Sequence, residues 1–292
     1  DRNSIAQNLN EMKQQIYQEG NTNYAGRYVF TGYKTDTSLI FNEDISSNTT
    51  YNITETFSSK DIEAISKVIN ENHLSAYNPA DPVGSLAGLN TPTLHNTHRI
   101  RLSYDQLDNI AVGSQLEYKK YDNSVSPPVE VTVNLPLQNI SVTDANAYNP
   151  SAGTINFIPE TGELIINDAD FLDMRLAIDD SIKLSYDKSQ FKKGDLRPEH
   201  YFDCVKTDST DPTNPITTNY KLNKDGQKIQ YEINFSQKLT INTEGKDAIK
   251  HSIGRTIDEI QEAIKDVTTT ETKIREVEKL LKEPNNSASQ IA

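Results

Sequence analysis

Five aliphatic residues near the end of the chain recur at intervals of seven. They are Ile253, Ile260, Val267, Ile274 and Leu281, and Ile257 and Ile264 occupy the companion position in the first two repeats. Apolar residues at this spacing form one stripe along a helix and are typical of coiled coils and long helical bundles. The pattern therefore predicts a long helix that ends before Pro284, since a proline inside a helix breaks it.

The beginning of the chain carries a second helical stripe. It consists of Ile5, Leu9, Met12 and Ile16, and Gly20 follows as a stop signal. No clear capping combination precedes this stripe, so we expect the helix to continue a longer one. We expect the two stripes to pack against each other, which brings helices from opposite ends of the chain together.

Between the two helices the apolar pattern changes from helical to alternating. The strand candidates are residues 51–54, 100–104, 116–118, 129–133, 154–157, 164–166, 182–186 and 229–233. One helix is expected among them over residues 62–69, capped by Ser58 or Ser59. Residues 51–53 and 231–234 share a pattern, and we expect them to pair in a small sheet.

These elements predict an α+β multidomain fold, in which a discontinuous helical rod domain with small β-hairpins carries an inserted mostly-β domain. We assign residues 1–85 and 222–292 to the rod and residues 86–221 to the insert. The Pro- and Gly-rich segment 78–84 is the expected exit from the rod.

The charge balance excludes several classes of partner. With 42 acidic and 29 basic residues, the chain carries a net charge of -13 and has no basic patch interleaved with aromatic residues. Nucleic acid and anionic membrane surfaces require a positive footprint, so we expect neither as a partner. No apolar run is long enough to cross a bilayer, and no ordinary secretion signal is visible.

The sequence offers no convincing catalytic or metal-binding group. His95 and His98 lie in an expected loop without further ligands, and His200 stands four residues before Cys204, the only cysteine. Aspartates between residues 168 and 180 could form a catalytic pair, but an acidic chain offers many such pairs by chance. We therefore expect no enzyme activity, no cofactor and no metal.

A glycine-bracketed aromatic segment follows the first helix. Residues 23–37 read NYAGRYVFTGYKTDT, in which Gly26 and Gly32 bracket an expected strand over residues 28–31. Glycine permits a tight turn or a close backbone approach at each end. The residues that we expect to form structural or interaction contacts, here and in the heptad helix, are Tyr24, Gly26, Arg27, Tyr28, Phe30, Gly32, Tyr33, Ile253, Ile257, Ile260, Ile264 and Val267.

This segment resembles the bacterial flagellar hook-associated protein 3 family, the hook-filament junction proteins of the flagellin-like group. In that family a helix is followed by a Gly-Arg-Tyr-(aliphatic)-Phe-(Ser/Thr/Ala)-Gly strand, which residues 26–32 match. The Phe-Asn-Gly motif common in flagellin is missing. Residues 239–245 before the heptad helix are also similar to the corresponding part of flagellin-like proteins.

The resemblance implies a structural subunit that joins the hook to the filament by packing of helical rods, with a rod domain like that of flagellin. It implies a ring of copies of this chain, a member of the hook-associated protein 1 family, flagellin and a cytoplasmic export chaperone as partners. It also implies an extracellular location, reached through the flagellar type III apparatus without a cleaved signal peptide. The alternatives are flagellin itself, or an adhesin or carbohydrate-binding module in the inserted β domain.

Overall fold

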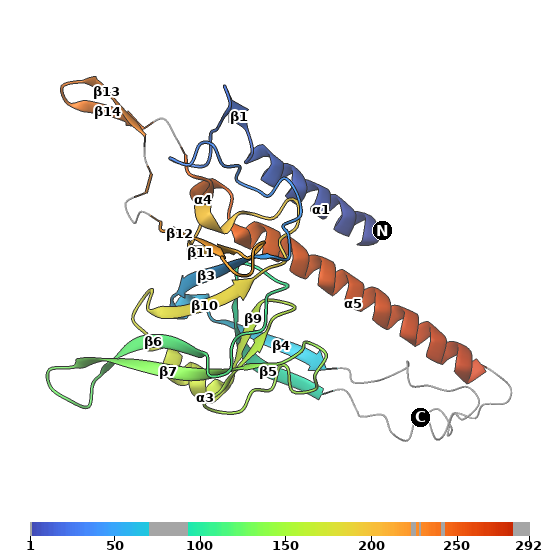
Figure 1. Cartoon of the computed structure of the whole chain (residues 1–292). Helices are drawn as coiled ribbons and strands as arrows, with labels where there is room; N and C mark the ends of the chain where they lie inside the picture. The colour runs from blue at the N-terminus through green and yellow to red at the C-terminus, as the bar shows by residue number, and fades with distance from the viewer. Residues whose placement is uncertain (1, 70–92, 223–225, 228, 241–242, 283–292) are drawn as a thin grey trace.

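The computed structural model describes residues 2–69, 93–222, 226–227, 229–240 and 243–282 (Figure 1). Its largest element is a sheet of ten strands in the order β12-β11-β3-β10-β6-β7-β8-β9-β5-β4. Every neighbouring pair is antiparallel except β7 and β8, which makes the sheet mixed. The strands are β3 (Thr49–Phe57), β4 (Glu63–Ile69), β5 (Thr93–Arg101), β6 (Gln115–Asp122), β7 (Val129–Asn139), β8 (Ile155–Ile158), β9 (Glu163–Ile166), β10 (Ile182–Lys188), β11 (Asp203–Asp208) and β12 (Ile216–Tyr220).

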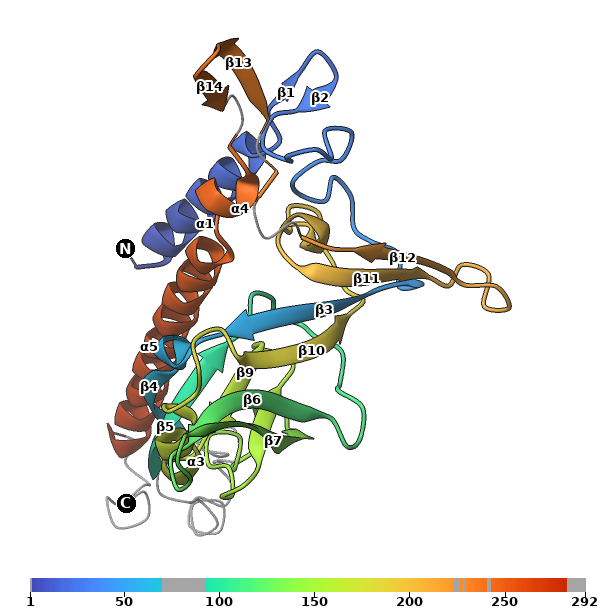
Figure 2. The same cartoon turned by 90° about the vertical axis from the view of Figure 1, so that its left-hand side faces the viewer.

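Helices form the smaller part of the molecule. Two long ones come from the chain ends, α1 (Arg2–Glu19) and α5 (His251–Lys282), and two short ones are α3 (Asp168–Met174) and α4 (Gly245–Ala248). Two separate hairpins, β1 (Asn23–Tyr24) with β2 (Arg27–Tyr28) and β13 (Gln230–Asn234) with β14 (Gln237–Thr240), stand at the same end of the molecule (Figure 2).

The predicted helical rod domain is wrong. The protein is mostly β, with α1 packed on α5 beside one mixed ten-stranded sheet. The first segment assigned to the rod contributes β3 and β4 to this sheet, and β3 lies between β10 and β11. Alternating burial along β3 explains its place, because every second residue from Thr49 to Phe57 points into the core.

The helix predicted over residues 62–69 is also wrong. Ser58 caps a short 3₁₀ helix at Ser59–Asp61, so the N-cap signal was genuine. The following residues form β4, which pairs along its whole length with β5. Ile62, Ile65 and Val68 suit a helical period, but β-branched residues also favour strands, and the available partner strand decided between the two.

The alternating pattern located most of the other strands, but it gave no candidate for β11, β12 or β14 (Gln237–Thr240). Each of the remaining strand candidates overlaps an observed strand. The predicted pairing of residues 51–53 with 231–234 is wrong, because β3 pairs with β10 and β11 while β13 pairs with β14. His95 and His98 lie on β5 and not in a loop. The predicted exit segment, residues 78–84, lies outside the described residues.

One large core joins strands that are distant in the sheet. Ile53 of β3, Leu116 of β6, Phe157 of β8 and Leu184 of β10 are almost fully buried in the same apolar cluster. The sheet therefore curves around its own apolar face. A smaller cluster links the root of α1 to the body through Tyr17, Leu39, Ile40, Leu196, Tyr201 and Ile249.

The turn between β8 and β9 packs closely against the chain near Tyr104, and a substitution there can test this packing. Gly162 has a φ of +63°, and a Cβ placed there would lie 1.9 Å from the carbonyl oxygen of Tyr104. We expect Gly162→Ala to lower the free energy of unfolding by about 3 kcal/mol or more, from backbone strain together with overpacking. Urea denaturation followed by circular dichroism measures this loss.

Gly153 provides the matched control, because its φ is +77° but no atom lies within 4 Å of an added Cβ. Gly153→Ala should cost only the strain of the left-handed backbone, about 1 kcal/mol. Equal losses in the two variants would contradict the predicted steric contact at Gly162.

Candidate assembly surface

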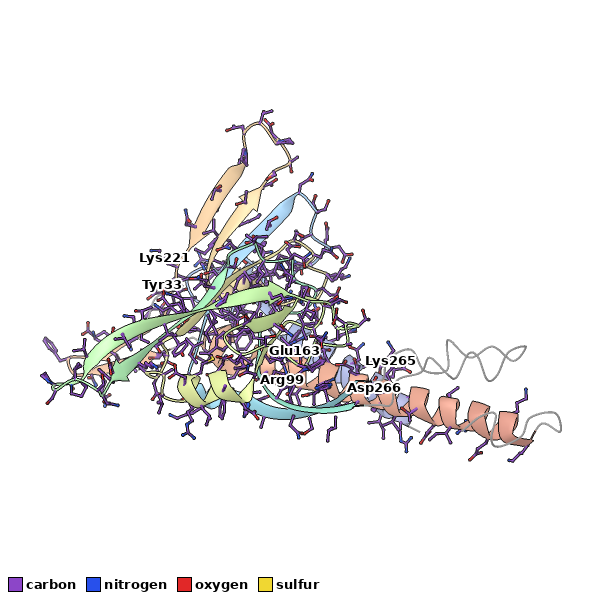
Figure 3. The ribbon with its side chains drawn as sticks, turned by 90° about the horizontal axis from the view of Figure 1, so that it is seen from below. Tyr33, Arg99, Glu163, Lys221, Lys265 and Asp266 are labelled. Carbon is purple, nitrogen blue, oxygen red and sulfur yellow. The ribbon has the colours of Figure 1, made fainter. Side chains whose placement is uncertain are left out.

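A buried arginine fixes α5 against the sheet. The side chain of Arg99 on β5 is 6% exposed, and its guanidinium binds Glu63 of β4 at 2.7 Å, Glu163 of β9 at 2.7 Å and Glu259 of α5 at 2.9 Å. Arg101 also binds Glu259. A buried charge is tolerated only when it is paired, so this cluster holds three strands and one helix in a fixed arrangement. Figure 3 labels two of its members, Arg99 and Glu163.

The acid–base properties of the cluster follow from burial and pairing. Burial acts to raise the pKa of Glu163, but the Arg99 guanidinium and the hydroxyl groups of Tyr148 and Thr161 outweigh it and hold the pKa below its usual value. The pKa of Glu259 is likewise lowered, because hydrogen bonds from Arg99 and Arg101 outweigh its burial. Both carboxyl groups are therefore stabilised in their charged form.

Hydrogen bonds from Arg255 on α5 extend this attachment. Its Nε donates to the carbonyl of Leu102 at 3.1 Å, and its terminal nitrogen donates to the carbonyl of Thr161. At the start of α5, the ring of His251 is enclosed by Tyr104, Tyr201 and Phe202. Burial and the nearby Arg255 lower the pKa of His251 to about 3. The sheet-facing side of α5 is thus held by several contacts within the chain.

Helix α1 runs antiparallel to α5 and contacts it mainly through small and polar groups. Tyr17 lies against Gly254, where a Cβ would come within 2.2 Å of the tyrosine hydroxyl. Lys13 binds Asp258 at 2.7 Å, and Arg2 binds Glu271 at 2.6 Å. Of the two predicted apolar stripes, Leu9 of α1 and Ile253, Ile257 and Ile264 of α5 are half-buried.

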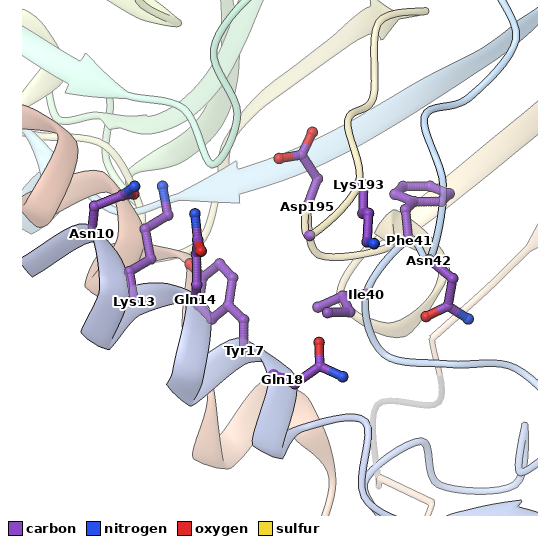
Figure 4. A pocket seen from close by; sticks show the side chains of 11 residues that line it. Asn10, Lys13, Gln14, Tyr17, Gln18, Ile40, Phe41, Asn42, Lys193 and Asp195 are labelled. Carbon is purple, nitrogen blue, oxygen red and sulfur yellow. The ribbon is translucent and has the colours of Figure 1, made fainter. Parts of the chain in front are cut away.

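The side of α1 that faces the body is polar. It borders a cavity of about 650 Å³, which separates the helix from the loops around residues 40–42 and 193–195 (Figure 4). Asn10, Lys13, Gln14, Tyr17 and Gln18 of α1 line it, opposite Ile40, Phe41, Asn42, Lys193, Gly194 and Asp195. An ordinary surface helix turns its apolar side toward the body, whereas Tyr17 is the one residue of α1 that is buried, in the apolar cluster at the root of the helix.

The apolar side of α1 faces away from the body. At about 100° per residue, Ile5, Met12 and Ile16 fall within about 40° of one another, and the cavity-lining residues of α1 lie between about 80° and 180° from them. Their side chains are 55%, 56% and 36% exposed. This stripe therefore points away from the cavity, although Leu9, about 40° from its centre, is half-buried.

A second exposed stripe runs along α5. Ile260, Val267 and Ile274 are 39%, 43% and 53% exposed. They lie about 100° around the helix from Arg255 and Glu259 on the sheet side and about 160° from Gly254 and Asp258 on the α1 side, whereas Glu271 lies about 40° away. Both stripes therefore lie on the outer side of the helix pair. We call these six residues, Ile5, Met12, Ile16, Ile260, Val267 and Ile274, the outer helix face.

The structure separates the predicted heptad residues into two groups. Ile253, Ile257 and Ile264 are half-buried, whereas Ile260 and Val267 are exposed on the outer helix face. All of them lie on α5, as predicted. Their distribution differs from a buried seam because polar contacts to α1 and to the sheet occupy the other sides of the helix.

The aromatic segment forms a hairpin and an anchored loop instead of one strand. Tyr24 and Arg27 pair across a turn in which Ala25 and Gly26 have φ values of +51° and +81°, as tight hairpin turns require. The expected strand over residues 28–31 extends only through Tyr28, at the end of β2.

The remaining aromatic residues divide between anchoring and exposed positions. Phe30 packs on the cluster at the root of α1, and its carbonyl accepts a hydrogen bond from the Gly245 amide. Gly32 lies beside Gln227, whose side chain accepts from the Tyr33 amide at 2.7 Å. Tyr24 and Tyr33 are 80% and 61% exposed. The segment thus ties both chain ends together while presenting two aromatic rings to solvent.

The residues considered in the sequence as possible catalytic or metal-binding groups make structural contacts. Burial raises the pKa of Cys204 to about 12, which is the opposite of an activated thiolate. His98 stacks on Phe171 with ring centres 3.7 Å apart. Asp173 accepts hydrogen bonds from Tyr118 and Lys120. Within the described residues, no group of three or more His, Cys, Asp or Glu side chains is placed to hold a metal ion.

Comparison with known proteins returned no match to a family model, to a curated protein or to a solved structure. In the described part of the chain, no helix has the length and apolar character needed to span a bilayer. The resemblance in residues 23–37 therefore stands on its sequence motif alone.

Sequence reasoning did not find the Arg99 cluster. Its members are separated by 36, 64 and 160 positions from Arg99, so no local pattern connects them. The one available signal was the pair Arg99 and Arg101, which places two cations on the same side of a strand in an acidic chain.

The Arg99 cluster predicts a pH-dependent stability difference. Glu163→Gln should lower the free energy of unfolding at pH 7 by about 3 kcal/mol, because it removes one carboxylate from a buried guanidinium. The folded-state pKa of Glu163 is depressed, so its contribution is present above the unfolded value of 4.5 and is lost as pH falls through the folded value. The difference between variant and wild type should therefore shrink below about pH 4.5.

Glu262→Gln is the matched control for this measurement. Glu262 is 3.9 Å from Lys67 and its side chain is 46% exposed, so its loss should cost less than about 0.5 kcal/mol. Chemical denaturation of the wild type and both variants between pH 3.5 and pH 8 measures these differences. Equal losses of stability in the two variants would contradict the role assigned to Glu163.

Proposed function

We propose that this chain is a structural subunit that assembles through its outer helix face. The observation that carries the proposal is the orientation of α1, with polar residues toward its own body and Ile5, Met12 and Ile16 toward solvent. Burial of an aliphatic side chain contributes about 1.5 to 3 kcal/mol. A helix with this orientation gains most when its exposed stripe is covered by another subunit.

The class of assembly that we propose is the bacterial flagellum, at the junction of hook and filament. The support is the motif in residues 26–32, together with helices from the two chain ends that run side by side. The proposed partners are copies of this chain in a ring, a hook-associated protein 1 family member, flagellin, and an export chaperone before assembly. The proposed location is extracellular, and the role needs no catalytic group.

The mechanical role follows from how the helices are attached. The sheet-facing side of α5 is bound to Arg99, Arg101 and Leu102, so a force applied to the outer helix face passes into the ten-stranded sheet. In this proposal the body is a rigid support, and lateral contacts form on one side of the molecule only.

A charge on the outer helix face tests this function. Met12→Asp should weaken self-association and binding to flagellin or to the hook-associated protein 1 of the same bacterium by at least about tenfold, because burying an unpaired carboxylate costs more than 1.4 kcal/mol. Sedimentation equilibrium and pull-down assays measure the effect.

Leu172→Asp is the control, because Leu172 is 53% exposed on α3 and lies outside the outer helix face. This variant should assemble and bind as the wild type does. The proposal fails if the wild type binds neither protein, or if both substitutions have the same effect. A chain that binds flagellin but not hook-associated protein 1 would instead be a filament subunit.

A further inference from the structure

A second unpartnered apolar surface lies on the β13–β14 hairpin. Every residue of both strands is exposed. Tyr231 pairs with Leu239 on one face of the hairpin, and Glu232 pairs with Lys238 on the other. Tyr231, Ile233, Phe235 and Leu239 are 61%, 62%, 108% and 52% exposed. The hairpin is therefore amphipathic, and its apolar residues face solvent.

A two-stranded hairpin with this exposure lacks the packing that ordinarily stabilises one. Isolated hairpins are marginally stable in water unless a third strand or a helix covers them. Within the described residues, β13 and β14 pair only with each other. A helix with an exposed apolar stripe could cover the apolar residues of the hairpin, because both surfaces would then be removed from water.

The chain itself contains such a helix stripe, but at the wrong end to cover its own hairpin. The hairpin extends from the end of the molecule where α5 begins, whereas α5 runs in the opposite direction (Figure 1). At 1.5 Å per residue, Ile274 lies about 35 Å from the first residue of α5. A second copy placed along the helix axis would bring its hairpin to this distal half.

Charge also favours an apolar contact between copies over an ionic one. Each chain carries a net charge of -13, so two copies repel each other at long range. Salt screens this repulsion, with a Debye length of about 8 Å at physiological ionic strength. Association between copies should therefore strengthen as salt is added, the reverse of an interface built from ion pairs.

We propose that the apolar residues of the β13–β14 hairpin dock onto Val267 and Ile274 of α5 in a second copy of this chain. The contact is head to tail, because the hairpin of one copy meets the helix of the next. Such a heterologous contact closes into a ring or continues as a filament. The inference rests on the proposed assembly function and adds a second surface to it.

Site-directed cross-linking tests which surfaces meet. Ser236→Cys places a thiol in the hairpin turn beside Phe235, and Thr270→Cys places one between Val267 and Ile274 on α5. Both parent residues are exposed. The native thiol of Cys204 is 3% exposed and its pKa is raised to about 12, so it provides an unreactive background. A short bismaleimide should link a mixture of the two variants into a covalent dimer.

The control replaces Ser236→Cys with Ser124→Cys, in the exposed turn between β6 and β7. Mixed with Thr270→Cys, it should give severalfold less dimer. The proposal is overturned if the two mixtures give equal yields. It is also overturned if Ser236→Cys alone or Thr270→Cys alone gives as much dimer as the mixture, because the contact would then join like surfaces.

A second measurement separates this inference from the proposed function. Phe235→Asp should weaken self-association by about 10- to 100-fold in sedimentation equilibrium, and should leave the thermal unfolding midpoint unchanged because the side chain is fully exposed. If Met12→Asp weakens association and Phe235→Asp does not, the hairpin contact is wrong and the assembly function stands. If neither substitution matters, both are wrong.

Discussion

The arrangement of the molecule depends on one buried guanidinium. Arg99 is paired with carboxylates from β4, β9 and α5, and removal of any one leaves charge unbalanced in a poorly solvated place. The cluster therefore fixes which side of α5 faces the sheet. Once that side is fixed, Gly254 and Asp258 are positioned to receive α1. The stripe of Ile260, Val267 and Ile274 is left outside.

The attachment of α5 to the sheet explains why α1 and α5 meet through polar groups while aliphatic residues of both helices face outward. Polar groups join α1 to α5 and line the cavity beneath α1, while aliphatic residues face outward. A monomer whose only requirement was stability would gain by the opposite orientation. In the proposed assembly, a neighbouring subunit would cover the outward aliphatic stripe.

Local patterns in the sequence predicted individual helices and strands better than they predicted which of these elements pack together. Alternation identified β7 and β10 because their side chains alternate between two environments. It could not distinguish a helix from β4, where residues 62–69 fit both periods and pairing with β5 decided the outcome. The heptads located α5, but not which of its residues would be buried. That was set by Arg99, which is 160 positions away from Glu259.

The contacts between α1 and α5 depend on the order in which the chain leaves the ribosome or an export channel. Lys13 and Asp258 are separated by 245 positions, and Arg2 and Glu271 by 269. A chain delivered from its N-terminus exposes α1 long before α5. Contacts of such long range form slowly. The contacts between α1 and α5 can form only after α5 has emerged, whereas the main apolar core is built from residues 41–204 and needs no part of α5.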